Sequence, residues 1–385
     1  MNILIVTEYF PQTTVSGVTG GVESRSLHLG KELAKEHNVT ILTSWQEGQK
    51  REDEIAGIKV IRCGSHHPYT NRGAVISRMK FALSALKAGR QLRGIDIVEG
   101  NTFITYLPAV YIAKHHGVPS IASYNEVWIG EWIRNKGLVT GMLGNIWERM
   151  VLSRGWTHFI AVSDFTAGKL RDRGISGKKI TVVHNGIDLR EIKNIRADKA
   201  SKPAVCYIGR LTERKRVEDL LYAVSSAIQR VPELRCVIIG SGAEMNSLKR
   251  LAKKLGIEDH TDFTGYIENH DDVLKSLKSS HVLCLPSVVE GFGIVVIEAA
   301  ACGVPFVLSD IDPLVEVSRK GKGGLIFKRR DVDDLAEKIV TLLTDRQLYD
   351  AKVKEAEDLA DLYDWAGIAG KIKEIYSNLV ETVPR

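Results

Sequence analysis

The stretch PSVVEGFGIVVIEAAACGVP, residues 286–305, sets two acids, Glu290 and Glu298, among small and apolar residues. It follows the apolar run HVLCL at 281–285, whose length is typical of a buried strand. The residues from about Ile294 predict a helix, so Glu290 lies in a loop and Glu298 one turn inside the helix. Because burying an unpaired carboxylate is costly, Glu298 favours ligand binding over packing. A glutamate satisfied by local partners is the alternative.

Strand-like and helical segments alternate on both sides of this stretch. Seven short apolar runs occur before residue 190 and six after residue 200, and most are bounded by Gly, Pro, Asn or Asp. Strands that alternate with helices predict a parallel sheet covered on both faces. Two such series predict an α/β chain with two doubly wound domains. The polar stretch 188–202 is the best candidate for the linker between them.

Composition excludes several classes of protein. The 385 residues are 44% hydrophobic and 26% charged, which is typical of globular domains and not of disordered, collagen-like or coiled-coil chains. No run of eighteen apolar residues predicts a spanning helix. The start, MNILIVTEYF, lacks the features of a secretion signal, so we expect a cytoplasmic protein. Five scattered cysteines without a CxxC pair favour reduced thiols over disulfides or a zinc site.

Charge is uneven along the chain. The formal net charge is +6, and residues 1–200 carry +9 while the remainder carries −3. Residues 55–95 hold no acid, and their cations are Lys59, Arg62, Arg72, Arg78, Lys80, Lys87, Arg90 and Arg93. Such a stretch attracts nucleic acid, phospholipid headgroups or a phosphorylated substrate. A solvated helix face is the alternative.

Two further loops follow predicted strands and suit phosphate. Residues 16–23, SGVTGGVE, precede the first helix, where glycine amides and a helix N-terminus favour an anion. Residues 209–216, GRLTERKR, follow the strand AVCYI and place Arg210 and Lys215 at a sheet edge. Arg binds two oxygens at once and Lys acts as a point charge, so this pair suits a diphosphate. The alternatives are a flexible turn in the first loop and a solvated basic turn in the second.

These motifs together resemble one enzyme family. Glu290-x7-Glu298 within EGFGIVVIEAAACGVP, with GRLTERK at 209–215, HNGID at 184–188 and GGVE at 20–23, is similar to the retaining glycosyltransferases of family 4. The resemblance implies the GT-B fold, in which two Rossmann-like domains face a cleft. We therefore expect an acceptor domain at 1–190, joined by a C-terminal helix at about 366–385, and a nucleotide-sugar donor domain at 200–365.

The resemblance also implies residue roles. Arg210 and Lys215 would bind the donor diphosphate and stabilise the departing nucleotide, and Glu290 would hold hydroxyls of the donor sugar. These three are the expected catalytic residues. Glu298 would bind the nucleotide ribose, while backbone atoms of the glycine-rich loops would line the sugar and phosphate site. The expected substrate-binding residues are Gly20, Gly21, Asn125, Phe292, Gly293, Ile294 and Glu298.

The donor implied by the resemblance is a UDP-, GDP- or ADP-sugar, with no metal and no cofactor. Many relatives carry a histidine in the first-domain loop near the sugar, but here the loop after VPSIAS reads Tyr124-Asn125-Glu126. Asn125 or Glu126 is expected to contact the sugar instead. No acid is obviously poised as a covalent nucleophile, so front-side attack within the donor–acceptor complex is the favoured path.

The expected acceptor is a glycan or a glycolipid. The basic stretch 55–95 contains an apolar helix with Val75, Met79, Ala82, Leu83 and Leu86, and residues 128–156 combine four tryptophans with Leu138, Met142, Leu143 and Ile146. This combination suits peripheral contact with an anionic membrane at its inner face. Helices that simply pack on the sheet are the alternative. We expect no nucleic-acid partner, because exposed aromatic residues are not interleaved with the cations.

Two other protein classes are alternatives to a glycosyltransferase. A nicotinamide oxidoreductase needs a glycine fingerprint after the first strand, and the residues there, EYFPQ at 8–12, fit it poorly. A non-catalytic protein that binds nucleotide sugars or glycans on the same fold is the closer alternative. Donor hydrolysis would distinguish it from an enzyme.

Overall fold

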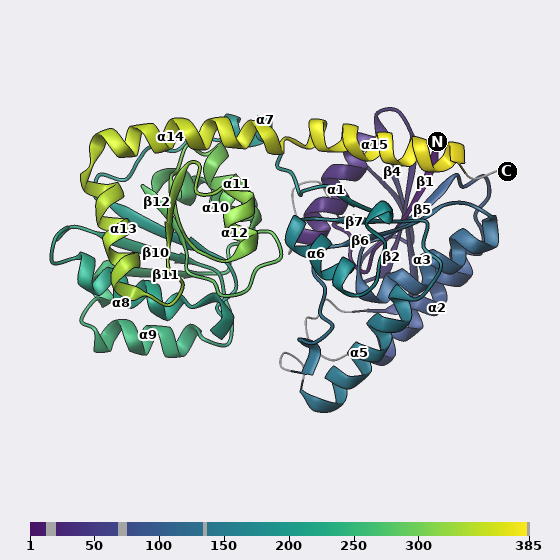
Figure 1. Ribbon diagram of the computed structural model, residues 1–385, viewed down its shortest axis with the longest axis horizontal. Coiled ribbons are helices and arrows are strands. Elements are labelled where there is room, and N and C mark those ends of the chain that lie inside the picture. The colour runs from purple at the N-terminus through teal and green to yellow at the C-terminus, as the bar shows by residue number, and fades with distance from the viewer. Residues whose placement is uncertain (13–20, 68–74, 134–136, 383–385) are drawn as a thin grey trace. The chain divides into compact units, whose positions relative to one another are not determined.

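The computed structural model describes residues 1–12, 21–67, 75–133 and 137–382 (Figure 1). The chain forms two compact units, one comprising Met1–Asn185 with Trp365–Arg385 and the other Gly186–Asp364. Each unit is built on its own sheet, covered by helices. The expected α/β architecture with two doubly wound sheets is confirmed.

The first unit holds an eight-stranded sheet. Its strands, in spatial order, are β3 (Glu52–Ile55), β4 (Ile58–His66), β2 (Asn38–Trp45), β1 (Asn2–Val6), β5 (Ile97–Gly100), β6 (Ser120–Tyr124), β7 (His158–Ala161) and β8 (Ile180–Val182). Its helices are α1 (Gly21–Ala34), α2 (Val75–Gln91), α3 (Phe103–His116), α5 (Leu138–Leu152), α6 (Asp164–Asp172) and α15 (Trp365–Thr382), with the 3₁₀ turn η1 at Gly177–Lys179.

Side chains of β1 alternate between two apolar cores. Ile3 and Ile5 pack with residues of α1 and α15 on one face of the sheet. Leu4 and Val6 pack with residues of α2, α3 and α5 on the other face. Successive strand side chains point to opposite faces, so a strand buried on both sides must be apolar at every position. This explains why the run NILIVT shows no polar alternation.

One strand departs from the expected all-parallel arrangement. β3 pairs antiparallel with β4 at the sheet edge. The two strands are joined by Ala56 and Gly57, whose φ angles of 52° and 77° fit the two-residue turns that suit a hairpin. The sequence EDEI at 52–55 contains one apolar residue, so its composition gave no strand signal.

The last helix belongs to the first unit, as expected. α15 packs beside α1 and contributes Trp365, Ile368 and Ile372 to the core there (Figure 1). The Tyr376 hydroxyl of α15 donates a hydrogen bond to Glu99 at the end of β5. Glu99 is fully buried and also accepts a hydrogen bond of 2.8 Å from the Ser123 hydroxyl. Burial raises the pKa of Glu99, so these donors compensate a costly buried acid.

The second unit holds a six-stranded sheet in which every pairing is parallel. Its strands, in spatial order, are β11 (Thr261–Gly265), β10 (Arg235–Ile239), β9 (Ala204–Ile208), β12 (Val282–Leu285), β13 (Phe306–Ser309) and β14 (Gly324–Phe327). Its helices are α7 (Leu189–Asn194), α8 (Val217–Ala227), α9 (Met245–Lys254), α10 (His270–Ser279), α11 (Ile294–Ala301), α12 (Asp312–Val317), α13 (Val332–Thr344) and α14 (Arg346–Ala360). Three 3₁₀ turns complete it, namely η2 (Glu213–Lys215), η3 (Glu258–His260) and η4 (Asp361–Tyr363).

We predict that Tyr376→Phe lowers the free energy of unfolding of the first unit by about 1–3 kcal/mol, because it leaves the buried Glu99 short of one donor. Urea denaturation followed by circular dichroism measures the change. Tyr124→Phe is a matched control in the same unit, since the buried Tyr124 hydroxyl has no hydrogen-bond partner in the described part of the chain. An equal loss in both variants would contradict the role of the Tyr376–Glu99 contact.

Candidate functional site

Two loops of the second unit meet at the carboxyl edge of its sheet. β9 and β12 are neighbours, and both strands run in the same direction. The loop after β9 begins at Gly209, and the loop after β12 begins at Pro286. Because parallel strands deliver their carboxyl ends to one edge, the motifs GRLTERK and EGFG come together although about 75 residues separate them.

The contact that joins the loops is an ion pair between Lys215 and Glu290. The Lys215 ammonium donates to Oε1 of Glu290, and the Ser287 hydroxyl donates to the same oxygen at 2.8 Å. The side chains of Lys215 and Glu290 are only 15% and 13% exposed. A backbone hydrogen bond of 2.9 Å from Val288 to the Arg214 carbonyl fixes the loops relative to each other. The structure thus brings together two of the three predicted catalytic residues.

A third loop supports this arrangement. The turn at Gly240 and Gly242 follows β10, and the Leu211 amide donates to the Ser241 carbonyl at 2.9 Å. A Cβ atom on Gly240 would lie 2.0 Å from the Gly209 carbonyl oxygen, and one on Gly242 would lie 2.1 Å from the Leu211 carbonyl oxygen. These glycines therefore allow two backbones to touch in a tight turn between β10 and the following helix.

Gly293 sets the start of α11. It adopts φ = 89°, and a Cβ atom there would lie 2.7 Å from Cδ2 of Leu314. Ile294 is the first helical residue, as predicted, so the amides of the first turn lie just after the loop that carries Glu290. The ring of Phe292 is buried and meets Tyr363 edge to face at 5.9 Å. Its side chain is therefore a packing element, and the expected ligand contacts of residues 292–294 remain predictions for the backbone.

Glu298 has a partner that the sequence did not indicate. Its carboxylate is 3.2 Å from Nε2 of His270, the first residue of α10, and its side chain is 9% exposed. The Glu298 charge raises the pKa of His270 above its ordinary 6.5. A lone histidine 28 positions earlier in the chain carries no pattern that would reveal this pairing. The expected contact between Glu298 and ribose remains a prediction.

The remaining cations of the GRLTERKR loop differ in their surroundings. Arg210 is exposed, and its carbonyl accepts a 3.0 Å hydrogen bond from the Tyr207 hydroxyl. Arg216 adopts φ = 52° and makes two hydrogen bonds with Asp219 and an ion pair with Glu218 at the start of α8. Arg216 thus stabilises the first turn of α8. Its position in the basic loop does not by itself make it a diphosphate ligand.

The structure describes only some of the predicted site residues of the first unit. Gly20 lies outside the described residues, while Gly21 is the first residue of α1. Asn125 is half-buried after β6 and donates from Nδ2 to the Asn101 carbonyl at 3.4 Å. Oε2 of Glu126 accepts a 2.6 Å hydrogen bond from the Trp128 indole. The expected approach of Gly20 and Gly21 to a diphosphate, and of Asn125 to a sugar, therefore remains a prediction.

A buried acid holds the segment after Asn125 against α5. Glu148 of α5 accepts hydrogen bonds from the Trp128 amide at 3.1 Å and from the Trp132 indole at 2.6 Å. Burial raises the pKa of Glu148 to about 7. The Trp132 ring lies on Gly144, where a Cβ atom would be 2.5 Å from it. The tryptophans of this region therefore organise a small core.

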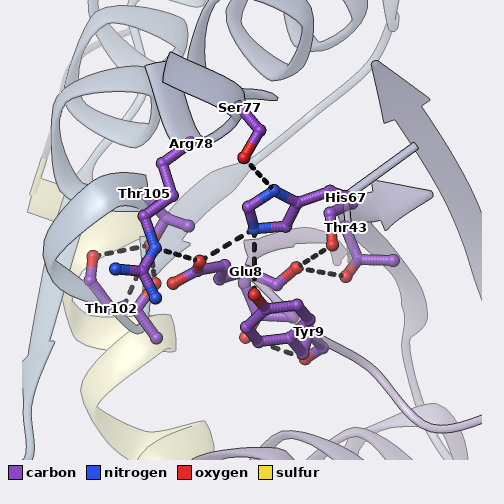
Figure 2. Close-up of polar contacts among 10 residues, drawn as sticks. Glu8, Tyr9, Thr43, His67, Ser77, Arg78, Thr102 and Thr105 are labelled. Carbon is purple, nitrogen blue, oxygen red and sulfur yellow. Dashed lines mark hydrogen bonds and ion pairs between the residues drawn. The ribbon is translucent and has the colours of Figure 1, made fainter. Parts of the chain in front are cut away.

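A second polar network lies at the carboxyl edge of the first sheet (Figure 2). Glu8, two residues beyond β1, pairs with Nε of Arg78 at 2.7 Å and with Nε2 of His67 at 3.0 Å. The other ring nitrogen of His67 is 3.0 Å from the Ser77 hydroxyl, and the Tyr9 hydroxyl is 3.0 Å from Nε2. Burial raises the pKa of Glu8, but the His67 hydrogen bond and the Arg78 charge outweigh it and lower the pKa.

This network corrects the sequence-based view of the basic stretch 55–95. Arg78 is paired with Glu8, and Arg62 is buried and lies 3.3 Å from Asp53. Neither is a solvated cation of a basic patch. A count of charges within residues 55–95 misses both pairs, because their acids, Glu8 and Asp53, lie outside that segment.

Family models match both halves of the chain. Residues 19–191 match the model described as Glycosyltransferase Family 4, and residues 188–359 match Glycosyl transferases group 1. The phosphatidyl-myo-inositol mannosyltransferase of Mycolicibacterium smegmatis is 30% identical over 380 residues, covering 94% of this chain and 91% of that protein. The chain belongs to glycosyltransferase family 4. The glycogen synthase of Mycobacterium tuberculosis is 27% identical over 398 residues, covering 98% of this chain and 94% of that protein.

Solved structures agree on the fold of this family member. Sucrose-phosphate synthase from Thermosynechococcus elongatus matches with a TM-score of 0.82 at 20% identity, covering 98% of both chains. HepE of Anabaena, solved in complex with UDP-glucose, matches with a TM-score of 0.75 at 18% identity, covering 98% of this chain and all of that one. The expected GT-B fold is confirmed.

Among the described residues, no group of three or more His, Cys, Asp or Glu side chains is placed to hold a metal ion. No helix within the same residues has both the length and the apolar character needed to cross a bilayer.

We predict that His270→Gln destabilises the second unit more at a pH just below 6.5 than at a pH well above it. The raised pKa means that the imidazolium–Glu298 attraction is fully present below 6.5 and is lost as the pH rises through the folded-state pKa. Because His270 is half-exposed, the effect is at most about 1 kcal/mol. Thermal midpoints at the two pH values measure it, and the same shift at both would contradict the pairing.

Proposed function

We propose that this glycosyltransferase moves a hexose from a nucleoside-diphosphate sugar to a hydroxyl of a glycan or glycolipid, with retention of anomeric configuration and without a metal ion. The observation that carries the proposal is the Lys215–Glu290 pair, shielded from water at the carboxyl edge of the second sheet. Open α/β sheets bind ligands at that edge. Family membership gives the general chemistry, and the pair supplies one cation and one acid suited to the two ends of a sugar–phosphate bond.

The leaving diphosphate is the group that needs stabilisation. As the bond between the anomeric carbon and the phosphate oxygen breaks, negative charge grows on that oxygen. Lys215 and Arg210 would meet this charge, together with the amides of the first turn of α11. These groups are already positioned by the backbone, so they need little rearrangement when charge develops. The acceptor hydroxyl attacks from the same side of the sugar and passes its proton to the leaving phosphate oxygen.

The Lys215–Glu290 ion pair would be exchanged for contacts with the donor. The diphosphate would replace Glu290 as the partner of Lys215, and sugar hydroxyls would donate to the released carboxylate oxygens. Ser287 stays bonded to Oε1 and keeps the carboxylate oriented. Each charge is thus compensated both with and without donor, which avoids leaving a poorly hydrated ion unpaired.

The proposed donor is a UDP-, GDP- or ADP-sugar. A matching structure contains UDP-glucose, which supports placing UDP-glucose first among the candidates. The names of the two relatives point to a glycan product in one and a phosphatidylinositol acceptor in the other. Both acceptor classes therefore enter the assay.

We predict that one nucleotide sugar of a UDP, GDP and ADP panel raises the thermal midpoint of the protein and is consumed when an acceptor is supplied. A ligand at about a hundred times its Kd stabilises the folded state by about 2.7 kcal/mol. Nuclear magnetic resonance of the product reports whether the anomeric configuration is retained. Stabilisation without hydrolysis or transfer would indicate a binding protein, and inversion would contradict the proposed mechanism.

We predict that Lys215→Ala lowers turnover by about 10²–10³-fold, because it removes a preorganised cation from the leaving group. It also lowers the unfolding free energy, since the largely buried Glu290 loses its cation. The double variant Lys215→Ala, Glu290→Gln should recover the stability and leave turnover low. Lys275→Ala is the matched control, because Lys275 pairs with Asp272 on the exposed side of α10.

Turnover and unfolding measured on the four proteins separate the two roles of the pair. Near-normal turnover in Lys215→Ala would remove Lys215 from the mechanism. Recovery of both stability and turnover in the double variant would make the pair purely structural.

A further inference from the structure

Exposed apolar side chains are concentrated in one part of the first unit. Fourteen large hydrophobic residues are exposed among the described residues, and ten of them fall within two short segments, 75–83 and 133–146. These ten are Val75, Ile76, Met79, Leu83, Ile133, Leu138, Val139, Met142, Leu143 and Ile146. Single exposed apolar residues are normal, whereas a concentration of this kind marks an interaction site.

The stripe on α5 is the more pronounced. Leu138, Val139, Met142, Leu143 and Ile146 recur at helical spacing and are between 51% and 73% exposed. The opposite side of the helix carries Glu148, Val151 and Leu152, which are buried. α5 therefore has two apolar sides, and the first unit covers only one of them.

The exposed charged residues of α2 and α5 are all cations. On α2 the exposed charged residues are Lys80, Lys87 and Arg90, and on α5 the exposed charged residue is Arg149. The acid of α5, Glu148, is buried and hydrogen-bonded, and α2 contains no acid. We call the exposed residues of α2 and α5 the apolar–basic face.

α2 and α5 lie on the same face of the first sheet. Residues of α2, α3 and α5 join one core on a single face of the first sheet, while α1 and α15 cover the other face (Figure 1). α3 contacts both α2 and α5. The sides of α2 and α5 that point away from this core therefore point away from the same face of the sheet.

We propose that the apolar–basic face docks on the surface of an anionic phospholipid bilayer. Apolar side chains would enter the boundary between headgroups and acyl chains, and the neighbouring cations would contact the headgroup phosphates. The inference rests on the proposed function for its purpose, because a lipid-linked acceptor is held in the same bilayer that the protein would bind. It selects the glycolipid from the two acceptor classes.

The exposed cations favour a bilayer over a second copy of the chain as the partner of the apolar–basic face. A two-fold dimer built on this face would place Lys80, Lys87, Arg90 and Arg149 of both copies within one interface, where like charges repel. An anionic bilayer compensates the same cations. The helices lie on the bilayer and do not cross it, because within the described residues none meets the length and hydropathy of a span.

The apolar–basic face contains aliphatic residues and methionines that the sequence predicted for a membrane contact, but the tryptophans expected with them are engaged inside the unit. Trp156 is buried, the Trp132 indole is bonded to Glu148, and the Trp147 indole is bonded to the Phe103 carbonyl. The membrane-facing groups are aliphatic residues and methionine instead. Variants on the face can therefore be made without disturbing the aromatic packing that holds α5 to the unit.

We predict that the full-length protein floats with vesicles of phosphatidylcholine mixed with phosphatidylglycerol, and does not float with vesicles of phosphatidylcholine alone. High salt should release it. The double variant Lys80→Glu, Lys87→Glu should bind at least roughly thirtyfold more weakly, since each cation at an anionic surface contributes about fivefold in affinity. The double variant Leu143→Asp, Ile146→Asp should abolish flotation.

Leu362→Asp is the matched control, because Leu362 is 54% exposed but belongs to the second unit and not to the apolar–basic face. Its flotation should equal that of the unchanged protein. Thermal midpoints confirm folding, and stabilisation by nucleotide sugar in solution, without vesicles, should be the same in every variant. Failure of flotation with donor stabilisation intact would overturn the docking proposal alone, and absent donor stabilisation would overturn the proposed function.

Two further results would overturn docking. Equal flotation with both vesicle types would show that the cations play no part. A dimer in light scattering that Leu143→Asp, Ile146→Asp converts to a monomer would show that the face binds a second copy.

Discussion

Parallel strand pairing is the constraint on which the candidate site depends. Because β9, β10 and β12 run in the same direction, their following loops emerge at one edge of the second sheet. Each loop alone is short and weakly informative. Their meeting creates an environment in which Lys215 and Glu290 are withdrawn from water and must find partners. The chemistry of the site is thus a consequence of topology, and the glycines at 240 and 242 allow the backbones to approach closely enough.

The same constraint acts differently in the first unit. There the carboxyl ends of β1 and β4 lead to Glu8 and His67, whose network with Arg78 is compensated within the unit (Figure 2). Glu99 at the end of β5 is likewise satisfied by Ser123 and Tyr376. Both sheets gather charge at their carboxyl edges. In the first unit the acids pair with residues of several neighbouring elements, whereas in the second unit Lys215 and Glu290 pair with each other across two loops.

The sequence predicted what depends on local pattern and missed what depends on distant partners. The strands and the start of α11 at Ile294 were predictable because periodicity and turn residues determine them, whereas the return of the last helix was implied by the family resemblance. β3 was missed because EDEI looks polar, and it is a strand only through pairing with β4. The partners of Glu298, Glu99 and Arg78 lie 28, 277 and 70 residues away along the chain, so no spacing rule could identify them. The Lys215–Glu290 contact could be anticipated only because both motifs end adjacent strands.

Exposed large hydrophobic residues are distributed unevenly between the two units. In the second unit the exposed large hydrophobic residues are isolated, namely Tyr222, Tyr266, Val289 and Leu362. Under the proposed function the second unit binds a soluble nucleotide sugar and has no need of an extended apolar surface, which would favour aggregation. The first unit exposes apolar residues on α2 and α5 in spite of that cost. Cations on the same face keep copies of the chain apart by repulsion and, by the same charge, favour an anionic surface, so the arrangement limits self-association while permitting docking.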